Sequence, residues 1–320
     1  MSHQMQKTIS SLTLVASLVM LALALSALLE RASAQTTIKD AGGRDVTITD
    51  TSRILSVGGD VTEILYALKA DDRIIAIDST SQFPANALAD KANVGYMRAL
   101  SAEGVLSTNP TVIIAAADAG PPPVVQVLKA SSIPYVEVPD DKSPEGVAAK
   151  IRFIAKVVGA DAAGEALAKD VERDFALLAE QRAKITKPVR ALFVLSVQNG
   201  RATIGGSGTS ADAILKLAGA ENAAAQTQGY KPLADEAAVE LAPDAILTMQ
   251  SGQGGPDAHA AQRISTVTAL QGSPALANKN VVEMNGLYLL GFGPRCARAA
   301  RELMASLYPE LMLKKASSGQ

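Results

Sequence analysis

The sequence predicts an α/β protein of two Rossmann-like lobes joined by a single long helix. Short apolar runs such as 54–57 and 112–116 alternate with helical patterns, which is typical of βαβ units around a parallel sheet. One spacing also occurs once in each half, namely a Glu, a Pro seven positions later, and an apolar run after it. Between the halves, residues 161–185 show a charged helical pattern that would span about 35 Å at 1.5 Å per residue.

Residues 1–34 have the features of a secretory signal peptide. Lys7 precedes an apolar stretch from Leu12 to Leu29, and the small residues Ala32-Ser33-Ala34 then predict cleavage after Ala34. The apolar stretch is close to the length that spans a bilayer, so a transmembrane anchor is the alternative. The position of the small residues favours the signal peptide, and it predicts an exported chain with no membrane span after cleavage.

The N-terminal lobe is predicted over residues 35–160. It opens with a hairpin whose turn lies at Gly42-Gly43. Short apolar strands and one amphipathic helix follow: strands 54–57, 74–77, 112–116 and 135–138, and helix 62–69. Ser143-Pro144 then begins a further helix, because Ser is a favoured N-cap and Pro suits the first helical position. That helix extends to Val158, before Gly159.

The C-terminal lobe is predicted over residues 186–320. Two strands flank the turn Asn199-Gly200, which is a strong hairpin signal. Thr209 or Ser210 caps the helix that follows. The predicted elements in order are strands 191–197 and 202–204, helix 211–217, strands 245–249 and 281–284, and a closing helix 298–307.

The spacing shared by the two halves runs from Glu103 to Pro110 and from Glu236 to Pro243. In each half it predicts a short helix, a stop marked by the proline, and a buried strand. The repeat therefore indicates two related lobes.

Composition excludes several classes of function. The chain has 320 residues and a formal net charge of −2, so no basic field favours nucleic acid. Its hydrophobic fraction is 48%, but aromatic residues make up only 3%, so the cores must consist mainly of aliphatic side chains and Ala. The single cysteine is Cys296, and the two histidines are His3 and His259. A site for bare zinc or copper usually needs several imidazoles or thiolates, so a carrier of such a metal is excluded.

No catalytic motif is complete. The segment 205–209 lacks the glycine spacing of a nucleophile elbow and the lysine of a phosphate-binding loop. We interpret it as a turn between a strand and a capped helix. A Ser-His-Asp hydrolase would depend on His259, which has no evident orienting acid. The sequence therefore predicts a binding protein and no enzyme.

The candidate site is the loop Gly95-Tyr96-Met97-Arg98. Loops at strand ends line the clefts of α/β proteins. A guanidinium beside a phenol favours the phenolate, which is a hard anionic ligand for ferric iron. From residue type alone, a surface tyrosine beside an ordinary arginine remains the alternative.

Several segments make this chain similar to the substrate-binding proteins of bacterial haem ABC importers, within the wider group that binds siderophores, cobalamin and haem. They cover nearly all of the mature chain, and the second and last point most specifically to the haem branch: 54–68, 94–101, Asn109-Pro110, 208–212, 229–233 and 289–295. The resemblance implies two α/β lobes with a helical backbone, and haem held between them in the periplasm.

The resemblance also implies roles for individual residues. Tyr96 would be the axial ligand of the haem iron, Arg98 would stabilise its phenolate, and Met97 would contact the ligand. Arg295 would pair with a propionate, or alternatively would cap its loop or form an ion pair within its own lobe. Lys231 carries the same ambiguity.

Two further roles follow from the same resemblance. Relatives that use a second ligand take a histidine from the second lobe, and only His259 could serve here. Glu103 and Glu236 match the acids that dock on the permease dimer of the importer, which works with its ATPase; the alternative is a solvated first-turn glutamate. The protein is expected to act as a monomer. A carrier of a ferric siderophore or cobalamin in the same fold, and a secreted hydrolase, are the competing functions.

Overall fold

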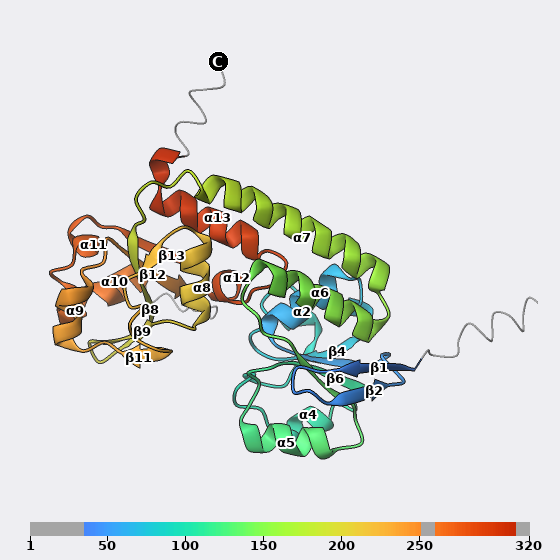
Figure 1. The fold of residues 1–320 in the computed structure, drawn as a ribbon. Helices are drawn as coiled ribbons and strands as arrows, with labels where there is room; N and C mark the ends of the chain where they lie inside the picture. The colour runs from blue at the N-terminus through green and yellow to red at the C-terminus, as the bar shows by residue number, and fades with distance from the viewer. Residues whose placement is uncertain (1–34, 251–259, 312–320) are drawn as a thin grey trace, which may run out of the picture.

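The molecule consists of two α/β lobes that are bridged along one side by a single long helix, as the sequence predicts (Figure 1). The computed structural model describes residues 35–250 and 260–311. The predicted signal peptide and His259 lie outside these ranges. Within the described residues, no helix combines the length and the apolar content needed to cross a bilayer.

The N-terminal lobe begins with the predicted hairpin and continues as alternating strands and helices. Its elements are β1 (Thr36–Lys39), β2 (Asp45–Ile48), β3 (Ile54–Val57), α2 (Gly59–Ala67), a 3₁₀ turn η1 (Asp71–Arg73), β4 (Ile74–Ile77), α3 (Ala87–Asp90), β5 (Ala92–Asn93), α4 (Ala102–Leu106), β6 (Val112–Ala116), α5 (Pro122–Ala130), β7 (Tyr135–Val138) and α6 (Pro144–Val158).

Five of these strands form a parallel sheet in the order β5-β4-β3-β6-β7. The central strand β3 is buried along its whole length, which explains why its sequence is nearly all apolar and does not alternate. The predicted cap of α6 is confirmed, because the Ser143 hydroxyl accepts a hydrogen bond from the Gly146 amide at 2.9 Å. Gly159 ends the same helix in the left-handed conformation, with φ at 69°.

The C-terminal lobe follows the long helix α7 (Asp161–Arg182). Its elements are β8 (Arg190–Gln198), β9 (Arg201–Gly205), α8 (Ser210–Leu217), β10 (Glu221–Asn222), β11 (Tyr230–Pro232), α9 (Asp235–Leu241), β12 (Ala245–Gln250), α10 (Ala260–Ser265), a 3₁₀ turn η2 (Thr268–Leu270), α11 (Pro274–Ala277), β13 (Val281–Asn285), α12 (Gly286–Leu290) and α13 (Cys296–Leu307).

The sheet of this lobe is mixed, in the order β11-β9-β8-β12-β13, with β10 also paired to β8. Strands β8, β12 and β13 are parallel, whereas β9 turns back against β8 through the predicted turn, where Asn199 and Gly200 both have positive φ. The antiparallel edge strand β11 was not predicted, because three residues ending in Pro232 carry no periodicity. The closing helix also begins two residues earlier than predicted, at Cys296.

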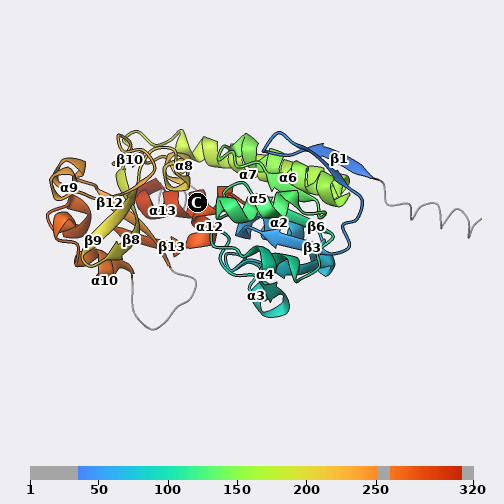
Figure 2. The ribbon, with the colours of Figure 1, turned by 90° about the horizontal axis from the view of Figure 1, so that it is seen from below.

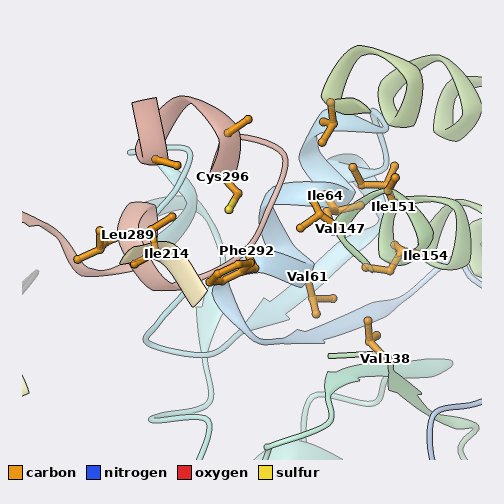
Figure 3. Packing of buried hydrophobic residues seen from close by; sticks show 14 of the residues in the cluster. Val61, Ile64, Val138, Val147, Ile151, Ile154, Ile214, Leu289, Phe292 and Cys296 are labelled. Atoms are coloured by element: carbon orange, nitrogen blue, oxygen red, sulfur yellow. The ribbon is translucent and has the colours of Figure 1, made fainter. Parts of the chain in front are cut away.

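Helix α7 runs alongside both lobes (Figure 1, Figure 2). It packs on α6 of the first lobe and on α13 of the second. Gly164 allows the close approach to α6, since a Cβ at this position would lie 2.2 Å from the Cβ of Ala155. A single buried apolar cluster continues from one lobe to the other, and part of it, from Ile151 and Val61 to Phe292 and Leu289, is shown in Figure 3.

Candidate functional site

A cavity of about 740 Å³ lies between the two lobes. The residues that line it follow the carboxyl ends of parallel strands in both sheets: Gly59 after β3, Asp118 after β6, Asp140 after β7, and Gly286 after β13. The carboxyl edge is where open α/β sheets bind ligands, because the loops diverge there and leave a crevice. The fold therefore directs the loops of both lobes into one space.

The predicted Tyr96 loop forms part of this cavity. The loop leaves the short strand β5 through a tight turn in which the Asn93 side chain accepts a hydrogen bond from the Gly95 amide at 2.8 Å. Gly95 has φ at 92°, a conformation that other residues adopt only with strain. Its carbonyl also accepts a hydrogen bond from Ser79, at 2.8 Å. Tyr96 follows this anchored turn with 46% of its surface exposed.

Arg98 and Asp118 hold the phenol of Tyr96 within a small polar cluster. The Nη1 atom of Arg98 donates a hydrogen bond to the Tyr96 hydroxyl at 2.8 Å, and the Nη2 atom pairs with the Asp118 carboxylate. Burial acts to lower the pKa of Arg98, but the charge of Asp118 and the bond to Tyr96 outweigh it and raise that pKa. The guanidinium is therefore a permanent cation beside the phenol. Sequence reasoning missed Asp118, which belongs to a separate loop.

Tyr230 lies in the cavity wall contributed by the second lobe. It pairs with Gly205 across β11 and β9, and its ring packs edge-on against Phe193 with centroids 6.4 Å apart. Burial raises the pKa of the Tyr230 phenol, although hydrogen bonding to Thr209 and to the Ala211 backbone opposes the shift. Sequence reasoning considered Lys231 and overlooked its neighbour, because the strand that turns Tyr230 inward was not predicted.

Two further ion pairs line the cavity, both in the first lobe. Lys150 on α6 contacts Asp60 on α2 at 2.5 Å, and the two side chains are only 2% and 12% exposed. Burial acts to lower the pKa of Lys150, but the charge of Asp60 outweighs it and the pKa is raised. Lys142 pairs with Asp140 on the loop after β7, also at 2.5 Å.

Arg295 forms an ion pair that the sequence-based alternatives did not include. Its guanidinium makes two hydrogen bonds of 2.8 Å to Glu63 of the other lobe and stacks 3.5 Å above the ring centroid of Phe83. Glu63 is buried, and Arg295 is absent from the residues that line the cavity. The ion pair therefore connects the two lobes, whereas the sequence suggested a propionate contact, a cap on the preceding loop, or an ion pair within one lobe.

The other candidates are placed as follows. Met97 is buried and lines the cavity beside Tyr96. Lys231 is exposed and does not line it. Glu103 is exposed on α4 and Glu236 lies on α9, so the two halves of the repeat form the short helices that the sequence predicts. His259 lies outside the described residues.

Comparison with known proteins gives a consistent result. Residues 54–286 match the family model described as periplasmic binding protein. The structure of the periplasmic heme-binding protein RhuT from Roseiflexus sp. RS-1, in apo form, is similar with a TM-score of 0.76 and 32% identity, over 82% of this chain and 100% of that one. The periplasmic heme-binding protein HutB of Vibrio cholerae has a TM-score of 0.69 and 32% identity, over 81% and 100% of the two chains.

Two curated sequences are also similar. The ABC transporter substrate-binding lipoprotein YvrC of Bacillus subtilis (strain 168) is 28% identical over 283 residues, which is 86% of each chain. A vitamin B12-binding protein of Vibrio parahaemolyticus is 23% identical over 252 residues, covering 78% of this chain and 87% of the relative.

Proposed function

Because this chain belongs to the periplasmic binding protein family, we propose that it captures haem and delivers it to an inner-membrane ABC importer. The observation that carries the proposal is the Tyr96 phenol, which faces a cavity between the lobes and accepts a hydrogen bond from Arg98. The similarity to two haem-binding proteins over nearly the whole of their chains supports the same function.

The Tyr96 cluster suits ferric iron. A phenolate is a hard anionic oxygen ligand, and tyrosine serves as a haem ligand in proteins. The charge of Arg98 would stabilise a phenolate bound to iron, and Asp118 fixes the position of the guanidinium through the second nitrogen. Nearly half of the Tyr96 surface is exposed, and the residue lines the cavity.

The rest of the cavity suits a flat apolar ring. Between the polar clusters the wall is made mainly of aliphatic and thioether side chains, contributed by both lobes: Met97, Ala116, Leu195, Met249, Leu287 and Leu290. A macrocycle placed between the lobes would remove this apolar surface from water, which is the main source of affinity for such ligands. Methionine side chains adapt to the ring because they are unbranched and polarisable.

Delivery completes the proposed function. After removal of residues 1–34 the protein would act in the periplasm as a monomer. Glu103 on α4 and Glu236 on α9 would dock on the permease dimer, which works with its ATPase. Each helix belongs to a different lobe, so docking through both acids would let the permease act on the distance between the lobes. Binding and release would involve no chemistry on the ligand.

A haem titration of the mature protein tests the proposal. Wild type is expected to give a saturable Soret band together with a phenolate-to-iron charge-transfer band. Tyr96→Phe should lose the charge-transfer band and bind haem at least about a hundredfold more weakly, a change of about 2.7 kcal/mol. Tyr66→Phe is the matched control, since it removes a buried hydroxyl that has no hydrogen-bond partner and does not line the cavity. Absence of saturable haem binding to wild type would reject the proposal.

Cobalamin is the second candidate, because two vitamin B12-binding proteins are among the similar curated sequences. A cobalamin site has no need for a phenolate, so cyanocobalamin binding should be unaffected by Tyr96→Phe. A ferric siderophore carrier remains the third, and it would be expected to offer free cations to its anionic ligand. Titration of cyanocobalamin in parallel with haem distinguishes the first two.

A further inference from the structure

The charged groups of the cavity are distributed unequally between the lobes. Six charged side chains line the described cavity, and all of them belong to the N-terminal lobe: Asp60, Arg98, Asp118, Asp140, Lys142 and Lys150. Three are cations and three are anions, so their formal charges cancel. In the wall formed by the C-terminal lobe, the described lining residues carry no charge.

Each cation of this wall is already paired with an aspartate of the same wall. Lys150 is bound to Asp60 in a nearly buried pair, and drawing the lysine toward a ligand would leave a buried carboxylate without its counter-charge. Lys142 is bound to Asp140. An anionic ligand would therefore have to compete with a carboxylate at both lysines.

Arg98 is engaged on both sides. One nitrogen of its guanidinium is bonded to Tyr96 and the other to Asp118. A ligand carboxylate that took the place of Asp118 would release an aspartate next to itself, and the two anions would repel each other. Arg98 thus supports the phenol, and its charge is already balanced by Asp118 before a second anion arrives.

The two cations that the sequence suggested for an anionic ligand face elsewhere. Arg295 is held by Glu63 and by stacking on Phe83. Lys231 follows Tyr230 in β11, and successive side chains of a strand point to opposite faces of the sheet. Since Tyr230 lines the cavity, Lys231 points away from it.

Resting on the proposed carrier function, we propose that the site recognises the iron and the ring of a metalloporphyrin and leaves its carboxylates in water. A carboxylate at the rim keeps its hydration, whereas one inside would meet only cations that are already paired with aspartates. The ligand class is then the ferric porphyrins, whatever the charge of their side chains.

Three ligands separate the contributions of iron, ring and carboxylates, and each is titrated against the mature protein in the same detergent. They are ferric protoporphyrin IX, its dimethyl ester, and metal-free protoporphyrin IX. The ester should bind within about threefold of haem, which is below the fivefold that one exposed ion pair can supply. The metal-free porphyrin retains both carboxylates and lacks the iron, and it should bind at least about tenfold more weakly than haem.

The outcomes distinguish the inference from the function on which it rests. If haem itself does not bind, the carrier function is rejected, and the inference with it. If haem binds and the ester binds more than about threefold more weakly, only the inference is overturned. A metal-free porphyrin that binds as tightly as haem would overturn it as well, because the iron would then contribute nothing.

Salt dependence and one variant give independent readouts. Exposed ion pairs to the ligand carboxylates would be weakened by salt over the range from roughly 0.05 M to 0.5 M. Because the inference leaves these carboxylates in water, affinity for haem should change by less than about twofold over that range. Lys231→Gln should leave the ratio of haem to ester affinity unchanged. A variant that weakens haem binding and not ester binding would show that Lys231 holds a propionate, contrary to the inference.

Discussion

The two walls of the cavity differ in kind. The wall from the N-terminal lobe contains the Tyr96–Arg98–Asp118 cluster and both lysine–aspartate pairs. The wall from the C-terminal lobe is uncharged among its described lining residues and is formed largely by glycines, small hydroxyl residues, methionine and leucine, with one phenol, Tyr230. The difference suggests a division of labour, in which the first wall holds the metal and the second covers the ring.

The contrast has a structural origin. In the first lobe the polar side chains lie on the loops that follow β5, β6 and β7 and on helices α2 and α6, and they converge at the carboxyl edge of one parallel sheet. In the second lobe the cavity is lined by the start of α8 and by the turns around α12, where glycines bring the backbone close. A backbone surface presents amides and carbonyls but no titratable group. One lobe can therefore provide a ligand, and the other mainly provides shape.

The two phenols test this division most strongly. Tyr96→Phe should lower haem affinity at least about a hundredfold, and Tyr230→Phe only about threefold. Burial raises the pKa of Tyr230, and among the described contacts no guanidinium donates a hydrogen bond to it, so it remains a neutral phenol near pH 7 and a poor ligand for iron. The measurement is haem titration of both variants, with the charge-transfer band as a second readout. Equal losses from the two variants would show that both walls ligate the iron.

The ion pair between Arg295 and Glu63 connects the two lobes, and it can be removed without changing a residue that lines the cavity. Glu63→Ala leaves the Arg295 guanidinium without its carboxylate in a partly buried place, and unfolding should require about 2 kcal/mol less free energy. Haem affinity should fall less than tenfold, because the iron cluster lies wholly in the first lobe. Urea unfolding and haem titration provide the two measurements.

The control for this variant is Asp170→Ala, which removes an exposed ion pair on α7. Its effect on stability should stay below about 0.5 kcal/mol. A loss of haem affinity in Glu63→Ala as large as that in Tyr96→Phe would contradict the proposed difference between the two walls. It would mean that the distance between the lobes matters as much for haem binding as the Tyr96 phenol does.

The sequence predicts the frame of this molecule better than it predicts the two walls. Strands such as β3 and β6 are apolar runs with clear boundaries, and Ser143-Pro144 marks a helix start through local chemistry alone. The partners of Arg98 and Arg295 could not be predicted in this way. Asp118 and Glu63 are distant in sequence from the arginines that they bind, and only the packed sheets and lobes bring them together.

Tyr230 shows a second reason for the missed residues. Its strand is three residues long and depends on pairing with β9, so no period in the sequence marks the inward face. The sequence drew attention to Lys231 because a cation could pair with an anionic ligand. Lys231 follows Tyr230 in the strand, so it points to the opposite face of the sheet. Short edge elements of this kind depend on tertiary pairing, and the residues that they place in a site become evident only from the fold.

The smallest predicted effect concerns the start of α8, which forms part of the uncharged wall. Asp212 lies beneath this turn, bonded to Lys216 and to Asn222 at 2.7 and 3.1 Å. Burial acts to raise the pKa of Asp212, but these hydrogen bonds outweigh it and lower the pKa below its ordinary value of 3.8.

Because the folded state holds the carboxylate charged, Asp212 contributes stability above the unfolded pKa and loses that contribution as the pH falls through the folded pKa. Asp212→Asn should therefore be about 1 kcal/mol less stable than wild type at pH 7, and the gap should close below about pH 4. Urea unfolding as a function of pH measures the gap, and a gap that stays constant into acid would mean that packing of the side chain, and not its charge, supports this wall.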